Sequence, residues 1–152
     1  MLRKPAVAGR FYPAKPDELI KAIEGYLQPT DKSTQAVGIL VPHAGYMYSG
    51  HVAGAVYSCV DVGSSAVVLG PNHTGLGPPL SIMRSGEWVT PLGQMEIDQA
   101  LCERLMAADP QLAGDVEAHR FEHAIEVQLP FLQQLGGSSV KFAPIIIGTR
   151  NW

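Results

Sequence analysis

Two histidines follow apolar segments of similar length. His43 comes after the run at 36–41 (AVGILV), and His73 comes after the run at 66–69 (AVVL). Short, uninterrupted apolar runs are typical of strands that are covered on both faces. If the two strands are parallel and joined by a crossover helix, both histidines lie at one edge of the sheet, where open α/β sheets bind their ligands. Two neutral imidazoles at that edge suit a divalent metal such as Fe(II), Zn or Cu. From the residues alone, two ordinary loop histidines remain the alternative.

A third group of polar residues lies further along the chain. His119, Glu122 and His123 form the pattern H-x-x-E-H, and Glu126 follows. In zinc hydrolases of the inverted type, this pattern supplies two histidine ligands and a glutamate base. Such enzymes also need a carboxylate ligand well downstream, and no Asp or Glu follows Glu126. The sequence therefore disfavours a zinc hydrolase. Glu122 and Glu126 are expected to share one face of a helix, either solvated or matched to the dipole at its N-terminus.

The elements that must position these residues follow from apolar spacing and caps. Helices are predicted at 17–27, from Ser49 onward, after a capping Asp98 to about 108, and over about 120–135. Strands are predicted at 36–41, 66–69 and 140–147, and Pro144 favours a bulge or an edge position for the last one. The segment from 36 to 69 fits a βαβ unit, and 78–97 is predicted to be an antiparallel excursion. We therefore expect an α/β fold with a mostly parallel sheet flanked by helices, in a single domain spanning 1–152.

Composition narrows the class of protein. Hydrophobic residues make up 46% of the chain and charged residues only 16%, which favours a large buried core over disorder. A net charge of −3 offers no basic surface for nucleic acid, and the early basic residues are expected at the surface, Arg3 among them. No apolar stretch is long enough for a membrane span, and the two cysteines, Cys59 and Cys102, do not form a disulfide framework. The start of the chain is unlike a signal peptide, so we expect a cytoplasmic protein with no nucleic-acid or membrane partner.

Six motifs point to a known family. AVAGRFYP, VPHAGYMYSG, LGPNHTG, TPLG with Asp98 after it, EHAIEVQLPFLQ and APIIIG occur in this order and together span nearly the whole chain. On these motifs the chain resembles the Memo family, whose bacterial and archaeal members are called AmmeMemoRadiSam system protein B. That family is in turn similar to the class III extradiol ring-cleavage dioxygenases, which use non-haem Fe(II). The resemblance implies a dioxygenase-like α/β fold.

The resemblance also implies roles for particular residues. His43 and His73 match the first two metal ligands of the family. The residues expected to line the substrate pocket belong to the same motifs: Phe11, Tyr46 and Asn72. Glu122 and His123 match the EH of a family helix, and they are expected near the pocket as candidate catalytic residues or as packing residues.

The resemblance further implies that part of the site lies outside this chain. Family members are considerably longer, and their third metal ligand (a Cys or a carboxylate) and a further pocket histidine lie in the second half. Neither Cys59 nor Cys102 falls in a matching motif. We therefore expect a chain truncated at its C-terminal side that holds a divalent transition metal weakly or not at all. Its last strand, 140–147, is expected to form an exposed sheet edge that can mediate homo-oligomer formation.

Two functions are compatible with these observations. The first is a metal-dependent redox or dioxygenase-type activity of the full-length form on a small organic molecule. The second is a module that binds a peptide or protein partner in the same cleft without turnover. The zinc hydrolase is a remote third. Bound metal separates the first two, because only the redox enzyme needs it.

Overall fold

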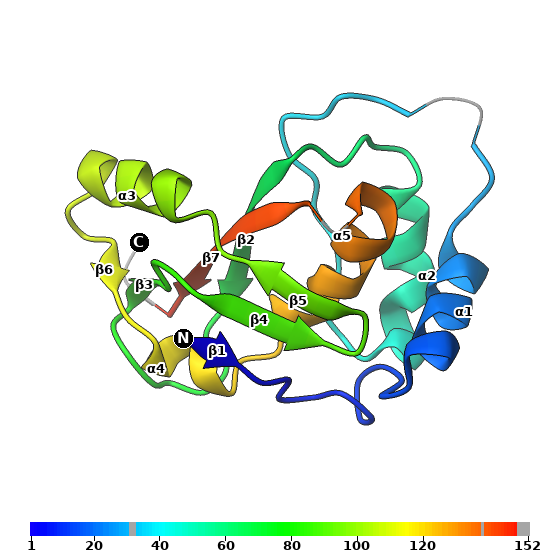
Figure 1. Ribbon diagram of the computed structural model, residues 1–152, viewed down its shortest axis with the longest axis horizontal. Helices are drawn as coiled ribbons and strands as arrows, with labels where there is room; N and C mark the ends of the chain where they lie inside the picture. Colours follow the sequence, from blue (N-terminus) through cyan, green and yellow to red (C-terminus); the bar gives the residue numbers. More distant parts are fainter. Residues whose placement is uncertain (31–32, 138, 149–152) are drawn as a thin grey trace.

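The computed structural model describes residues 1–30, 33–137 and 139–148, which form two sheets flanked by helices (Figure 1). The predicted α/β class is confirmed. The larger sheet has the strand order β2-β7-β3-β6, with β2 at Ser65–Pro71, β7 at Lys141–Ile147, β3 at Leu80–Ile82 and β6 at Ala113–Gly114. The smaller sheet has the order β1-β4-β5, with β1 at Leu2–Arg3, β4 at Glu87–Thr90 and β5 at Gly93–Glu96. The helices are α1 (Pro16–Tyr26), α2 (Tyr46–Tyr57), α3 (Gln99–Ala108), α4 (Glu117–Arg120), the 3₁₀ turn η1 (Glu126–Gln128) and α5 (Leu129–Gly136).

The longest ladder of the larger sheet joins β2 to β7. The two strands are parallel and in register over their full lengths, whereas β3 runs antiparallel to β7, so the sheet is mixed. The prediction that β7 forms an exposed edge is wrong, because β7 has a strand on each side. Pro144 is tolerated there because the ladder with β3 ends at the Ile82–Ile145 pair, so the missing N–H of proline removes no bond to β3. Among the described residues, the edge strands of this sheet are β2 and the two-residue β6.

The predicted strand at 36–41 is wrong. The structure forms no strand there, and Val37 and Leu40 are 112% and 93% exposed. Only Thr34, just before the run, makes a parallel bridge, to Val60. A strand needs a ladder partner for its backbone groups as well as apolar side chains, and this run has no such ladder. The predicted βαβ unit therefore keeps its helix and its second strand but lacks its first.

The predicted helix over 120–135 is divided. Residues 121–125 form no helix and lie between α4 and η1. The carboxylate of Glu122 accepts hydrogen bonds from the backbone N–H groups of His123 and Ala124, which satisfies these donors without helical partners. Glu122 and Glu126 consequently do not share a helix face, in contrast to the prediction.

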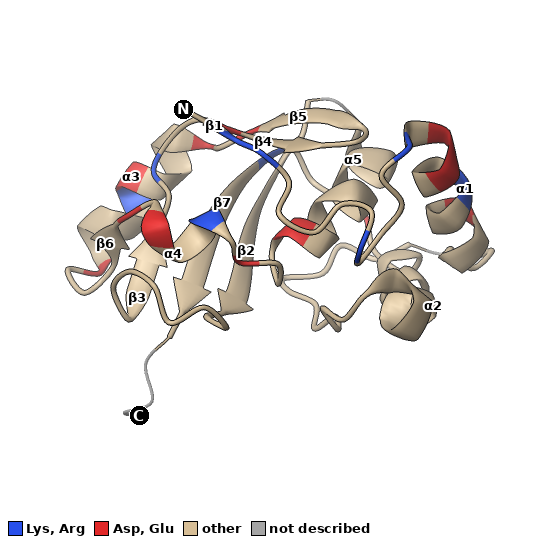
Figure 2. Cartoon of the chain, turned by 90° about the horizontal axis from the view of Figure 1, so that it is seen from below, with Lys and Arg blue, Asp and Glu red and all other residues tan. Residues whose placement is uncertain are grey.

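The other elements follow the predicted pattern more closely. The first helix is α1, and the Asp98 carboxylate caps α3 by accepting the Leu101 N–H at 2.9 Å. The strands β4 and β5 pair antiparallel within the predicted excursion. Charged side chains gather on α1, α3 and α4, whereas α2 and β2 carry none (Figure 2). Within the described residues, no helix has the length and apolarity needed to cross a bilayer.

Candidate metal centre

Three histidines from separate segments converge on one place. His43 precedes α2, His73 follows β2, and His123 lies between α4 and η1. Each offers one ring nitrogen, and these nitrogens lie within 4.8 Å of one another. The ring centroids of His73 and His123 are 4.4 Å apart in a stacked arrangement, and that of His43 is 5.2 Å from His73 and 5.9 Å from His123. The two histidines singled out from the strand positions are therefore brought together, although the first of those strands is absent.

The donor set fits a transition metal. Imidazole nitrogen is a common ligand of Zn, Cu and Fe. Bonds of about 2.0–2.1 Å to one metal hold the ligand nitrogens about 3–4 Å apart, so the rings need to approach by about 1 Å to share an ion. In the part of the chain that the structure describes, no other cluster of His, Cys, Asp or Glu side chains meets the same spacing.

Glu122 contacts His73 and His123 and is fully buried. Its Oε2 accepts the His73 backbone N–H at 2.6 Å, and its Oε1 lies 2.9 Å from His73 Nδ1. Oε1 also accepts the N–H groups of His123 at 2.8 Å and Ala124 at 3.0 Å. Burial raises the pKa of Glu122, but the hydrogen bonds from His73, Ala124 and His123 outweigh it, and the net pKa is lowered. The group is therefore a carboxylate at neutral pH.

Burial favours the neutral form of two of the three histidines, His43 and His123. Burial, reinforced by the charge of a protonated His73, lowers the pKa of His43. Burial is also the main cause of the lowered pKa of His123, where the attraction of Glu122 opposes it. A lowered pKa leaves the ring lone pair free at neutral pH, and a neutral imidazole is the form that binds a metal.

A buried ion pair anchors the segment that carries these groups. Arg3 Nη1 pairs with Glu126 Oε2, and both side chains are almost completely buried. The Glu126 carboxylate also accepts the N–H groups of Ala6 and Val7 and the hydroxyl of Tyr12. Arg3 donates to the backbone oxygens of residues 119 and 122 as well. The expectation that Arg3 lies at the surface is wrong, since it joins the N-terminal segment to the site.

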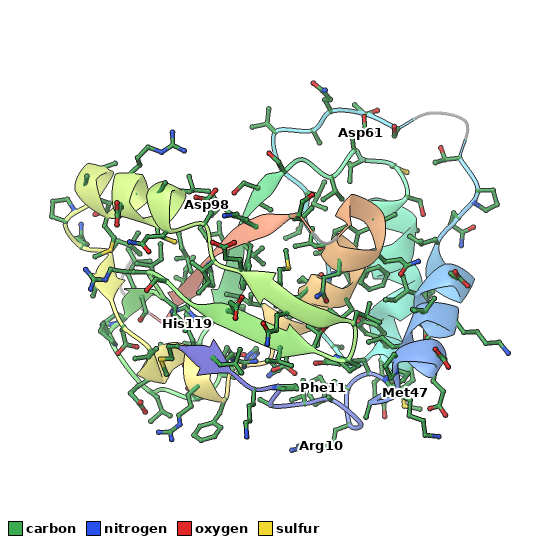
Figure 3. All side chains as sticks on the ribbon, viewed as in Figure 1. Arg10, Phe11, Met47, Asp61, Asp98 and His119 are labelled. Carbon is green, nitrogen blue, oxygen red and sulfur yellow. The ribbon has the colours of Figure 1, made fainter. Side chains whose placement is uncertain are left out.

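The predicted pocket residues occupy different environments. The Phe11 ring lies 4.7 Å from the His123 ring, on the N-terminal segment beside the start of α2 (Figure 3). Tyr46 is 4% exposed, and its hydroxyl donates to the Val127 oxygen, so it is part of the core. The Asn72 side-chain oxygen accepts three hydrogen bonds from Thr74 and Gly75, which shapes the loop after β2. Of the three, Phe11 touches the histidine cluster directly.

The two histidines of the H-x-x-E-H pattern do not form a pair of ligands. His119 is fully buried against Trp88 and lies outside the cluster that contains His123 (Figure 3). Neither of its ring nitrogens has a hydrogen-bond partner among the described residues. Burial lowers its pKa to about 4, so the ring is neutral. The geometry thus offers no zinc-hydrolase site, because the helix that would align these residues is interrupted.

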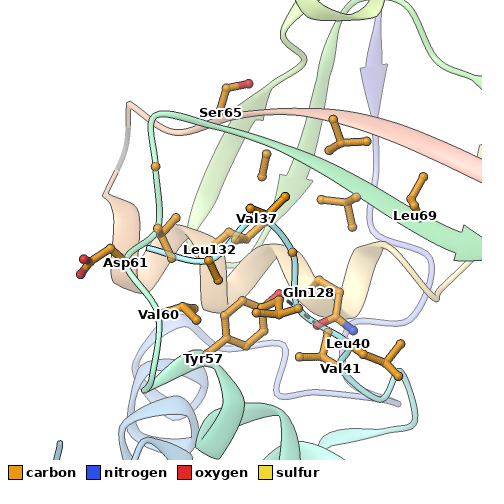
Figure 4. A pocket seen from close by; sticks show the side chains of 18 of the residues that line it. Val37, Leu40, Val41, Tyr57, Val60, Asp61, Ser65, Leu69, Gln128 and Leu132 are labelled. Carbon is orange, nitrogen blue, oxygen red and sulfur yellow. Dashed lines mark hydrogen bonds between the residues drawn. The ribbon is translucent and has the colours of Figure 1, made fainter. Parts of the chain in front are cut away.

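A groove runs from the metal centre along the free edge of β2. It has a volume of about 560 Å³ and lies between the 36–41 segment and β2, with His43 at its border (Figure 4). Its lining is mainly apolar and includes Val37, Leu40 and Leu69. The floor carries Gln128, which accepts the Tyr57 hydroxyl and donates to the backbone oxygen of Pro42. The groove therefore combines an apolar surface with a strand edge that has no ladder partner among the described residues.

Comparison with known proteins agrees with the motifs. The family model described as Memo-like protein matches residues 3–152. A MEMO1 family protein of Thermoplasma volcanium is 43% identical over 154 residues, covering 99% of this chain and 57% of the relative. A MEMO1 family protein of Methanopyrus kandleri is 45% identical over 99% of this chain and 58% of the relative. One from Aquifex aeolicus is 45% identical over 96% of this chain and 55% of the relative. The chain thus spans somewhat more than half the length of these relatives, and it belongs to the Memo family.

Proposed function

We propose that this chain provides the first part of a non-haem metal centre, and that the full-length form performs metal-dependent redox chemistry of the dioxygenase type on a small organic molecule. The convergence of His43, His73 and His123 over a buried carboxylate carries the proposal. Three imidazoles from three segments, with ring nitrogens within 4.8 Å of one another, are an unusual arrangement for side chains that bind nothing.

Each residue has a distinct task in this proposal. His43 and His73 hold the metal, of which Fe(II) is the first choice and Cu or Zn are alternatives. A bound Fe(II) supplies a Lewis acid and a redox couple suited to O₂ chemistry. His123, neutral and stacked on His73, accepts the proton of a substrate hydroxyl. Phe11, in contact with the His123 ring, provides an apolar wall for the substrate.

Metal binding tests the proposal. Equilibrium dialysis against Co(II), a stable stand-in for Fe(II), is expected to show weak binding of one ion per chain. His43→Ala and His73→Ala remove two of the available donors and are expected to abolish it, whereas His123→Ala weakens it less. His51→Ala is the matched control, because His51 is exposed on α2 and lies outside the cluster. Binding of one ion that survives both the His43 and the His73 substitutions would refute the assignment.

Turnover needs a separate test. O₂ uptake by an Fe(II)-loaded full-length relative, with catechols as trial substrates, is expected to disappear when the residues equivalent to His43 and His73 are replaced. Uptake that persists in both variants would contradict the redox role.

A second candidate function is supported by the groove. The free β2 edge offers unpaired backbone, and the side chains of Val67 and Leu69 are 44% and 61% exposed beside it. An extended peptide can add to such an edge by main-chain hydrogen bonds. Binding of an apolar peptide that is indifferent to chelator and to His73→Ala would favour this function over the redox one.

A further inference from the structure

The contacts of Glu122 bear on which ring nitrogen of a ligand histidine carries the proton. A neutral imidazole carries one proton, on either Nδ1 or Nε2, and only the other nitrogen has a lone pair in the ring plane. A ligand histidine must therefore have its proton on the nitrogen that faces away from the metal. A neighbouring carboxylate that accepts that N–H fixes the choice.

The surroundings of Glu122 fix its own role as an acceptor. Three backbone N–H groups, from His73, His123 and Ala124, donate to its two oxygens. Backbone N–H groups cannot reverse their role, so both oxygens are turned towards donors. Two ring contacts remain, from Oε1 to His73 Nδ1 at 2.9 Å and to His123 Nδ1 at 3.3 Å. The shorter one, to His73, is satisfied only if Nδ1 carries the ring proton.

The same carboxylate also fixes where the rings stand. It holds His73 by both its backbone and its ring, and it holds the backbone of His123, whose ring stacks on that of His73 at 4.4 Å. Gly70 makes this closeness possible, because a Cβ at that position would come within 3.0 Å of Ile125 and 3.1 Å of Ala124. The end of β2 can therefore approach the 122–125 turn closely enough for Glu122 to reach His73.

We propose that Glu122 is a positioning residue that holds His73 in the Nδ1–H tautomer, so that the Nε2 lone pair is the one offered to the metal. The proposal rests on the proposed function for the metal, but the tautomer itself is a property of the metal-free chain. Glu122 does not bind the metal in this account, since both its oxygens already face N–H groups of His73, His123 or Ala124.

Long-range ¹H–¹⁵N correlation spectra of the metal-free chain, recorded at about pH 8 where histidine is neutral, report the tautomer directly. We expect His73 in the Nδ1–H form in the wild-type chain. His51, exposed on α2, serves as the internal reference for an unconstrained ring. A wild-type His73 in the Nε2–H form would overturn the proposal without any variant.

Two substitutions at Glu122 separate the effect of its acceptor oxygen on His73 from the effect of its side-chain volume. Glu122→Gln keeps an oxygen that can face His73 Nδ1, and is expected to retain the Nδ1–H form. Glu122→Leu has similar size but no acceptor, and is expected to shift His73 towards Nε2–H. Glu117→Gln is the matched control, because Glu117 is an exposed acid of α4 that contacts Arg120 and no histidine. If the Leu variant folds and keeps His73 fully in the Nδ1–H form, the proposal is wrong.

Metal affinity gives the second readout. Loss of such a supporting carboxylate weakens metal binding by about 10- to 100-fold, so we expect Co(II) binding by Glu122→Leu to fall within that range, with Glu122→Gln between it and the wild type. Equal affinity in all three chains would overturn the positioning role. A chain that binds no Co(II) yet shows the Nδ1–H form would refute the proposed metal function while supporting the role of Glu122.

Discussion

Two segments that border the histidine cluster contrast in polarity and burial. The 119–126 segment is rich in charged and polar residues, yet His119, Glu122 and Glu126 are fully buried. The 36–41 segment is entirely apolar apart from a glycine, yet Val37 and Leu40 are almost completely exposed. The difference shows that in this chain burial follows from the partners that a segment finds. Arg3, two backbone N–H groups and the Tyr12 hydroxyl make the buried Glu126 tolerable, whereas the apolar run forms no ladder with any strand among the described residues.

The three clustered histidines differ in the same way. His73 and His123 both form hydrogen bonds with the buried carboxylate of Glu122, and these bonds fix their positions relative to each other. His43 stands at the end of the 36–41 segment, where the Pro42 oxygen accepts one hydrogen bond from Gln128. Two of the three clustered histidines are thus built into the core, and His43 is attached at its margin.

The largest expected effect comes from removing the anchor of the buried segment. Glu126→Ala leaves the guanidinium of Arg3 buried without its partner and deprives two backbone N–H groups of their acceptor. Breaking a buried pair in this way costs about 3–5 kcal/mol. Urea denaturation should show a loss of that size in the free energy of unfolding. In Val37→Ala, the same measurement should change by less than about 0.5 kcal/mol, because the side chain is exposed.

The second effect concerns acid stability. His119 is fully buried, and its pKa is lowered by burial to about 4. As the pH falls below the unfolded value of about 6.5, the unfolded chain takes up a proton that the folded chain does not, so stability declines until about pH 4. A lowering of this size corresponds to about 3 kcal/mol.

Replacement by an aromatic residue tests this assignment. His119→Phe keeps a ring against Trp88 but cannot titrate. Urea unfolding at pH 7 and at pH 4.5 should show a smaller loss in the variant than in the wild type. Equal losses in the two proteins would mean that the acid sensitivity arises elsewhere.

A smaller effect distinguishes two glycines. A Cβ on Gly70 would make tight contacts of 3.0 Å with Ile125 and 3.1 Å with Ala124, whereas a Cβ on Gly38 meets nothing within 4 Å. Gly70→Ala should destabilise the chain by about 1 kcal/mol or more, as expected of overpacking. Gly38→Ala should be neutral or stabilise by up to about 1 kcal/mol through the unfolded state. Thermal unfolding of the two variants side by side measures the difference, and a larger loss for Gly38→Ala would contradict the contrast.

The sequence predicted the elements whose signals are local. The cap at Asp98, the spacing of α1 and the apolar strand β2 are each encoded within a few residues. The position of His43 and His73 after apolar runs also predicted that the two histidines lie close together, as they do. His123 was expected near them from the family motif, and the structure places it there.

The features that were missed depend on residues far apart in the chain. Arg3 and Glu126 are 123 positions apart, and nothing in their immediate surroundings signals that they pair in the core. The break in the helix at 121–125 depends on where the Glu122 side chain turns, which helical periodicity does not report. The exposed run at 36–41 shows the converse, since a strong local pattern cannot supply a strand partner. Co-variation between positions 3 and 126 in related sequences is the signal that would reveal the pair.

Metal-edge X-ray absorption of the chain, with protein in excess over Co(II), tests the central claim most directly. In the wild-type chain and in His51→Ala, the account predicts imidazole nitrogens from His43 and His73 at about 2.0–2.1 Å from the metal. In His43→Ala and in His73→Ala, where binding is lost, it predicts a first shell of oxygen alone. A first shell of oxygen alone in the wild-type chain, or one that is unchanged by these two substitutions, would contradict it.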